Sequence, residues 1–167
     1  MSRTPCFFLE KYNFKSKKYE RIAPLVWNWE HTEREPADLF PFNGCHEMFS
    51  IVEGRGGEFP DMNGIHQDLP DDVSEEISNI FIKDCKEVSD YSVGPHARYF
   101  TYADMYIYLL KYPKIYGWDE EKEKSGKIRN PLFQLKERVD AFLEVEGEFC
   151  WNYVNEMSNI RIVYWIF

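Results

Sequence analysis

The stretch Ile160-Arg161-Ile162-Val163-Tyr164-Trp165-Ile166-Phe167 decides the fold, because it carries the clearest strand signal in the chain. β-branched and aromatic side chains dominate it, and that composition is typical of a strand buried on both faces. We expect this strand to pair with a hairpin from the amino terminus and to close a small sheet. Removing even a few of these residues should therefore remove core material.

The expected amino-terminal hairpin has strands at residues 6–12 and 19–29, joined by the turn-like segment 13–18. Pro24 interrupts the second of these strands. Because proline has no N–H to donate to a strand ladder, we expect this strand to start late or to lie at an edge.

Hydrophobic periodicity and capping residues predict three helices. The first starts at Asp71 or Asp72 and runs to about residue 87. The second spans residues 101–112, with a capping box that begins at Thr101 and a stop at Pro113. The third follows Asn130 as its cap. The inward positions are Val73, Ile77, Ile80 and Phe81 in the first helix, and Leu132, Leu135, Val139, Phe142 and Leu143 in the third.

These elements predict a single α+β domain over residues 1–167, in which about three helices pack on a small antiparallel sheet. Residues 45–96 form an irregular, acidic, loop-rich insertion; between residues 30 and 70, only residues 45–52 could make a short helix. Residues 119–127 are expected to form a charged, near-neutral loop. Long segments without regular structure are unusual in compact domains. They usually serve a function or are held together by a bound group such as a metal ion.

The net charge of −9 comes from one part of the chain. Residues 45–90 hold 12 acidic and 3 basic side chains, whereas residues 1–44 sum to +1 and residues 91–167 to −1. Such a run can be a solvated helix face, or a patch that steers a basic partner onto the protein. The acidic balance argues against direct nucleic-acid binding, which needs clustered Lys and Arg. The candidate partner-binding residues are Asp68, Asp71, Asp72, Glu75, Glu76, Asp84 and Glu87.

Cysteine and histidine side chains in and near the insertion suggest a metal site. The candidate ligands are Cys45, His46, His66 and His96, with Asp68 and Asp90 as alternates. Zinc prefers four N, S or O ligands. One structural zinc ion could stabilise a segment that has no hydrophobic core of its own. The spacing matches no standard motif, however, and these histidines can equally be ordinary hydrogen-bonded loop residues.

Signals for an enzyme are weak, and we do not expect catalysis. The chain has no phosphate-binding loop, nucleophile elbow, HExxH motif or dinucleotide fingerprint. Cys45 beside His46 invites a nucleophile–base interpretation, but sequence neighbours rarely have the geometry that this pair needs. The remaining enzymatic alternative is a metal-dependent hydrolase built on Cys45, His46, His66 and His96.

Several segments resemble a family of small proteins encoded by bacteriophages and prophages. These segments are 7–12 (FFLEKY), 35–41 (EPADLFP), 43–46 (NGCH), 71–76 (DDVSEE), 102–108 (YADMYIY) and 161–165 (RIVYW). The resemblance spans nearly the whole chain, although its motifs carry no known chemistry.

A small acidic phage protein of this kind is also similar to the anti-CRISPR class, especially inhibitors of type II-A Cas9. Such inhibitors typically bind positively charged surfaces that otherwise hold guide RNA or target DNA, and some bind a metal. The resemblance therefore implies an inhibitor in the cytoplasm of the bacterial host. Its acidic segment would block nucleic-acid loading on a basic surface of a defence protein such as Cas9. The alternative is a phage accessory protein whose charge serves solubility.

Overall fold

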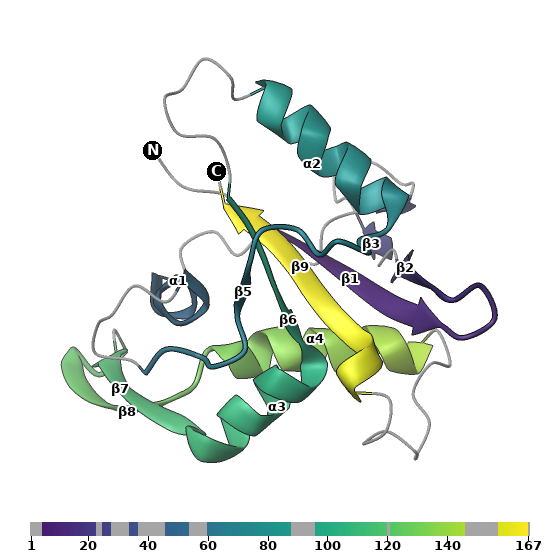
Figure 1. Ribbon diagram of the computed structural model, residues 1–167. Helices are drawn as coiled ribbons and strands as arrows, with labels where there is room; N and C mark the ends of the chain where they lie inside the picture. The colour runs from purple at the N-terminus through teal and green to yellow at the C-terminus, as the bar shows by residue number, and fades with distance from the viewer. Residues whose placement is uncertain are drawn as a thin grey trace.

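A five-stranded antiparallel sheet forms the centre of the computed structural model (Figure 1). Its strand order is β2-β1-β9-β6-β5. The strands are β1 (Pro5–Asn13), β2 (Lys18–Ile22), β5 (His66–Gln67), β6 (His96–Thr101) and β9 (Ile160–Ile166). The structure describes residues 5–22, 25–27, 34–36, 46–53, 60–87, 96–119, 121–145 and 157–166.

The carboxyl-terminal strand β9 is the middle strand of this sheet, as its composition predicts. It pairs with β1 on one side, where Leu9 lies opposite Ile162, and with β6 on the other. Every side chain from Ile160 to Trp165 is buried, and the most accessible of them, Arg161, is only 4% exposed. Ile160, Ile162 and Tyr164 join one core cluster, and Val163 and Trp165 join the second. The expected burial on both faces is therefore confirmed.

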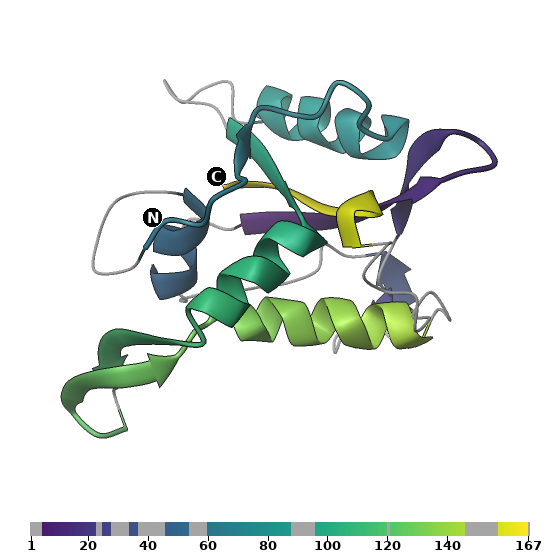
Figure 2. The same ribbon diagram turned by 60° about the horizontal axis from the view of Figure 1, so that its bottom comes forward.

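Helices cover both faces of the sheet (Figure 2). Residues of α1 (His46–Glu53), α3 (Tyr102–Lys111) and α4 (Leu132–Val145) build the larger core cluster with Phe7, Leu9 and Ile162. On the other face, α2 (Glu75–Glu87) packs on Phe8, Val163 and Trp165. The α+β class, with a small antiparallel sheet packed by helices, is confirmed.

The caps of α3 and α4 follow the sequence signals. The Thr101 hydroxyl accepts a bond from the Asp104 N–H at 3.1 Å, and the Asp104 carboxylate accepts one from the Thr101 N–H at 3.0 Å. The Asn130 side-chain oxygen accepts from the Leu132 N–H at 3.0 Å. The predicted inward positions Leu132, Leu135, Val139 and Leu143 are fully buried, whereas the side chain of Phe142 lies outside the described part.

The start of α2 differs from its prediction. Neither Asp71 nor Asp72 caps the helix, because both lie in a preceding turn, closed by the Val73 N–H donating to the Pro70 carbonyl at 3.1 Å. The helix begins at Glu75, since the Asp72 carboxylate accepts from Arg161 of β9 and does not turn back to the helix. The inward stripe is confirmed, because Ile77 is buried and Val73, Ile80 and Phe81 pack on the same core cluster.

The predicted strand 19–29 is two strands. β2 ends at Ile22, and β3 (Leu25–Trp27) pairs with β4 (Arg34–Pro36) in a separate two-stranded sheet. Pro24 lies between them, outside the described residues. Since proline cannot continue a ladder as a donor, a break at this place follows from the sequence.

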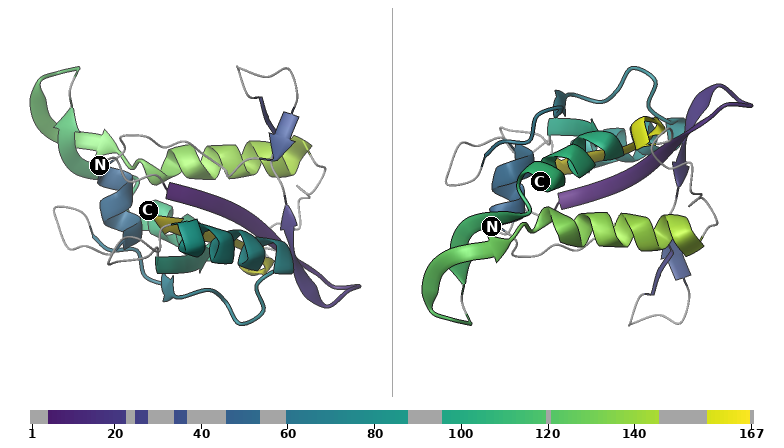
Figure 3. Two further views of the ribbon diagram at one scale, coloured as in Figure 1. Left: turned by 90° about the horizontal axis from the view of Figure 1, so that it is seen from above. Right: turned by 90° about the horizontal axis from the view of Figure 1, so that it is seen from below.

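The prediction of a loop at residues 119–127 is wrong. β7 (Lys114–Asp119) and β8 (Lys124–Arg129) form a hairpin that projects from one end of the molecule, opposite the β1–β2 hairpin (Figure 3). Its register pairs Ile115 with Ile128 and Asp119 with Lys124. An apolar pair and an opposite-charge pair across the strands favour the hairpin over an irregular loop.

The segment 45–96, where the structure describes it, contains one element beyond the two predicted helices, the edge strand β5. It contributes α1, which confirms the short helix, as well as α2 and the edge strand β5. A 3-10 turn, η1 (Met157–Asn159), leads into β9.

No helix in the described segments is long and apolar enough to cross a membrane.

Candidate protein-binding surface

The predicted partner-binding carboxylates gather around the start of α2. Asp68 follows β5, Asp71 and Asp72 lie in the turn before the helix, and Glu75 and Glu76 form its first turn. Asp84 lies in the last half of α2, and Glu87 is its final residue, whose side chain is outside the described part. Residues 60–82 contain six Asp and Glu and no Lys or Arg. All charged side chains in this stretch of the chain are therefore acidic.

Asp72 belongs to an ionic cluster that is centred on the buried Arg161–Glu10 pair and holds the turn before α2 on the sheet. Arg161 of β9 donates to Glu10 of β1 at 2.6 Å and to the Asp72 carboxylate at 2.7 Å. The second Glu10 oxygen accepts from the Ser74 N–H at 2.7 Å. The Arg161 guanidinium also lies over the ring of Tyr19, 3.5 Å from its centroid. Burial next to these charges raises the pKa of Tyr19, although Arg161 opposes the shift.

Two further predicted residues also bond to the scaffold. Glu76 pairs with Arg21 of β2, and the Asp84 carboxylate accepts from the Trp165 indole N–H at 2.9 Å. These bonds hold both carboxylates toward the sheet. The predicted residues that remain exposed, with no bond to another described side chain, are Asp68, Asp71 and Glu75.

Sequence reasoning missed Glu10 and Arg161. Both are charged, yet Glu10 is 0% exposed and Arg161 is 4% exposed. A signal existed: each interrupts an apolar strand, after Phe7-Phe8-Leu9 and between Ile160 and Ile162. A charge at such a position is buried, and buried charges need a partner of the opposite sign.

The predicted metal ligands are only partly placed. Cys45 and Asp90 lie outside the described residues, and of His46 only the backbone, at the start of α1, is described. His66 and His96 are both exposed. His66 lies opposite Tyr99, three residues along β6 from His96, which separates them by roughly 10 Å. The His66 ring stacks on Tyr99 with centroids 4.6 Å apart. Within the described ranges, no three His, Cys, Asp or Glu side chains could hold a metal ion together.

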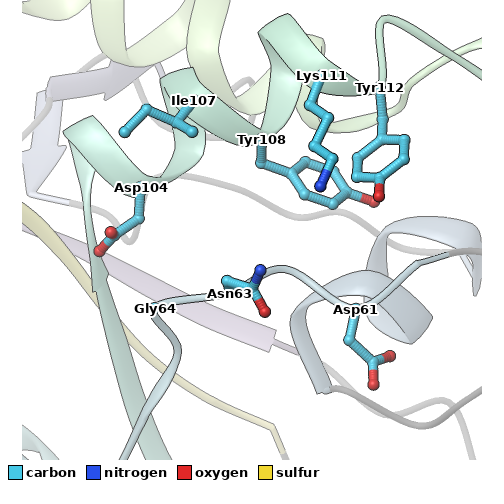
Figure 4. A pocket seen from close by; sticks show the side chains of 8 residues that line it. All are labelled: Asp61, Asn63, Gly64, Asp104, Ile107, Tyr108, Lys111 and Tyr112. Atoms are coloured by element: carbon cyan, nitrogen blue, oxygen red, sulfur yellow. The ribbon is translucent and has the colours of Figure 1, made fainter.

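A pocket of about 270 Å³ lies between α3 and residues 61–64 (Figure 4). Its lining residues are Asp61, Asn63, Gly64, Asp104, Ile107, Tyr108, Lys111 and Tyr112. Gly64 has a φ of +92°, and an added Cβ would lie 2.5 Å from the Asp104 carboxyl carbon, so the close approach requires glycine.

The polar groups of this pocket have structural roles. One Asp104 oxygen caps α3, and the Tyr108 hydroxyl donates to the Pro60 carbonyl at 2.8 Å. Burial raises the pKa of Tyr108 to about 12, so its hydroxyl stays protonated at neutral pH. The Tyr108 hydroxyl is therefore not a general base at neutral pH.

Comparison of the chain with models of known protein families, with curated proteins and with solved structures finds no match. The functional argument therefore depends on the chain's own residues.

Proposed function

We propose that this chain is a phage-encoded inhibitor that binds a basic, nucleic-acid-binding surface of a bacterial defence protein and blocks nucleic-acid loading there. Cas9 is the first candidate partner, on the strength of the sequence resemblance alone. The observation that carries the proposal is the start of α2, where five carboxylates fall within residues 68–76 without one Lys or Arg.

The protein would inhibit by placing carboxylates in a basic groove, so that nucleic acid cannot bind there. Asp68, Asp71 and Glu75 are exposed carboxylates that would occupy positions where a basic groove otherwise holds phosphates. Their attraction to such a groove raises the association rate and favours basic partners over neutral ones. The proposal includes no catalytic step and no metal.

The ionic cluster supports this proposal by holding the acidic surface in place. Arg161 bonds both to Asp72 and to Glu10, and Arg21 pairs with Glu76. The turn before α2 is thus tied to the sheet at several points. A surface held in its binding conformation before contact loses less conformational entropy on binding, which strengthens the complex.

An order-of-addition experiment tests occlusion. Purified protein is mixed with guide-free Cas9 before or after labelled guide RNA, and guide retention is measured by filter binding. We expect strong inhibition of loading when the protein is added first and weak inhibition when the guide is already bound. Absence of any complex with Cas9 in either order would contradict the Cas9 assignment and favour an accessory role.

A further inference from the structure

The β1–β2 hairpin carries an aromatic strip, which we define as Tyr12, Phe14 and Tyr19; Phe14 is exposed and the two tyrosines are partly buried. The Tyr12 ring contacts both others, with centroids 5.0 Å from Phe14 and 5.3 Å from Tyr19. Phe14 is 67% exposed at the tip of the hairpin, which extends beyond α2 (Figures 1 and 2). The strip lies on the α2 side of the sheet, since Tyr19 contacts Arg161 of the ionic cluster.

One end of the strip is basic. Lys15, Lys17 and Lys18 are exposed, and the one acidic side chain between residues 11 and 20 is Glu20, which accepts bonds from Asn13 and Ser16 of the turn. None of these three lysines forms an ion pair with a residue that the structure describes. The turn is well ordered: the Asn13 side-chain oxygen accepts from the Lys15 N–H at 2.9 Å, and the Asn13 carbonyl accepts from the Lys17 N–H at 2.8 Å.

The other end of the strip is acidic. Tyr19 is in contact with Arg161, and Arg161 bonds to Asp72, which lies between Asp71 and Glu75 in the acidic surface. A continuous line of contacts thus leads from the exposed Phe14 through the other two rings to these carboxylates. The hairpin tip and the start of α2 bound one surface with opposite charges at its two ends.

We propose that this surface binds a second copy of the same chain in a two-fold dimer. In a two-fold interface each patch meets its own copy turned by 180°, so the patch must be complementary to itself. A basic end, an aromatic centre and an acidic end satisfy this condition, because each basic tip meets the acidic end of the other copy. Aromatic side chains at the centre are typical anchors of such contacts.

Ligands with charge of one sign fit this surface less well. Nucleic acids and anionic membranes would attract the lysines, but they would repel the carboxylates a short distance away. The second copy supplies both signs in the required order.

The surface consists of three aromatic rings and a few charged side chains, so we expect a weak dimer, with a dissociation constant on the order of 10–100 µM. This inference goes beyond the proposed function and is independent of Cas9. Both associations use Asp71 and Glu75, and therefore a chain bound to a basic partner cannot be in this dimer.

Sedimentation equilibrium of the purified chain tests the dimer at protein concentrations from about 1 µM to about 1 mM. One variant reverses the basic end (Lys15→Glu with Lys18→Glu), and another reverses the acidic end (Asp71→Lys with Glu75→Lys). We expect a concentration-dependent dimer for the unchanged chain and monomers for each variant alone. An equimolar mixture of the two variants should form a heterodimer, because one of its two charge contacts is restored with inverted sign.

Two further variants make the experiment decisive. Phe14→Ala removes an exposed ring that the fold does not need, so the protein should stay folded. The dissociation constant of the dimer should rise at least about tenfold. Glu121→Lys with Glu123→Lys reverses two exposed charges near β8 and should leave the dimer unchanged. A monomer at every concentration, higher oligomers that do not stop at two, or a variant mixture without association would each overturn the proposal.

Discussion

Arg161 and Glu10 form a buried ion pair that links β1, β9 and the turn before α2. Both are buried in the middle of the sheet, and their contact joins β1 to β9. A buried ion pair gives little net stability over an apolar pair, because desolvation of two charges is costly. What the pair adds here is a fixed position for the turn before α2, since Glu10 accepts from Ser74 and Arg161 donates to Asp72.

Replacing Arg161 should therefore be costly. Arg161→Met leaves the Glu10 carboxylate buried without its partner, and we expect a loss of about 3–5 kcal/mol in the free energy of unfolding. Asp72→Asn is the comparison, because its carboxylate is 64% exposed and should contribute less than about 1 kcal/mol. Urea denaturation measures both. Similar costs for the two variants would contradict the central position of the Glu10 pair.

The double variant Glu10→Leu with Arg161→Met sharpens this test. If the cost of Arg161→Met comes from the stranded charge, removing Glu10 as well should recover part of it. A double variant that loses the full sum of both single costs would show that the two residues act independently.

Tyr108 should affect stability at alkaline pH. Its pKa is raised to about 12 in the folded protein by burial, against 10 in the unfolded chain. The group therefore stabilises the fold fully below pH 10, and this contribution is lost as the pH rises from about 10 to about 12. In Tyr108→Phe, the fall of the urea midpoint over this window should be smaller than in the unchanged protein. An identical fall of the urea midpoint in both proteins would contradict the raised pKa of Tyr108.

At the scale of elements, the capping box sets the start of α3. Thr101→Ala removes the hydroxyl that accepts from the Asp104 N–H, and we expect a loss of about 1 kcal/mol in the free energy of unfolding. Thr101→Ser keeps that hydroxyl and is the matched control, with an expected change of a few tenths of a kcal/mol. Thermal melts of the two variants that coincide would contradict the cap.

Sequence reasoning predicts well those elements whose structure depends only on residues close by in the chain. The β9 strand, the inward stripe of α4 and the caps at Thr101 and Asn130 depend on composition, periodicity and neighbours within four residues. The hairpin at β7–β8 was missed because its charged residues resemble a loop until their cross-strand partners are known.

The start of α2 and the candidate surface were less accessible to sequence reasoning. Asp72 is a good cap by composition, but it bonds to Arg161, 89 residues away. In the same way, local sequence does not show that Glu76 pairs with Arg21 or that Asp84 accepts from Trp165. The acidic segment was predictable, whereas which of its carboxylates remain free for a partner depends on tertiary contacts.

At the scale of the whole molecule, charge is separated along one side of the sheet. The tip of the β1–β2 hairpin is basic, and the start of α2 is acidic, although the net charge of the chain is −9. A partner therefore meets two regions of opposite charge. This arrangement makes the direction of approach specific, which a uniformly acidic surface would not do.

The measurement that tests the proposed function most directly is the affinity of guide-free Cas9 for three forms of this protein, by calorimetry. They are the unchanged chain, Asp71→Lys with Glu75→Lys, and the control Glu121→Lys with Glu123→Lys. We expect binding by the unchanged chain, a loss of more than about tenfold for the α2 reversal, and no change for the control. Circular dichroism first confirms that all three are folded. Equal affinity of all three forms for Cas9 would contradict the claim that the acidic start of α2 is the binding surface.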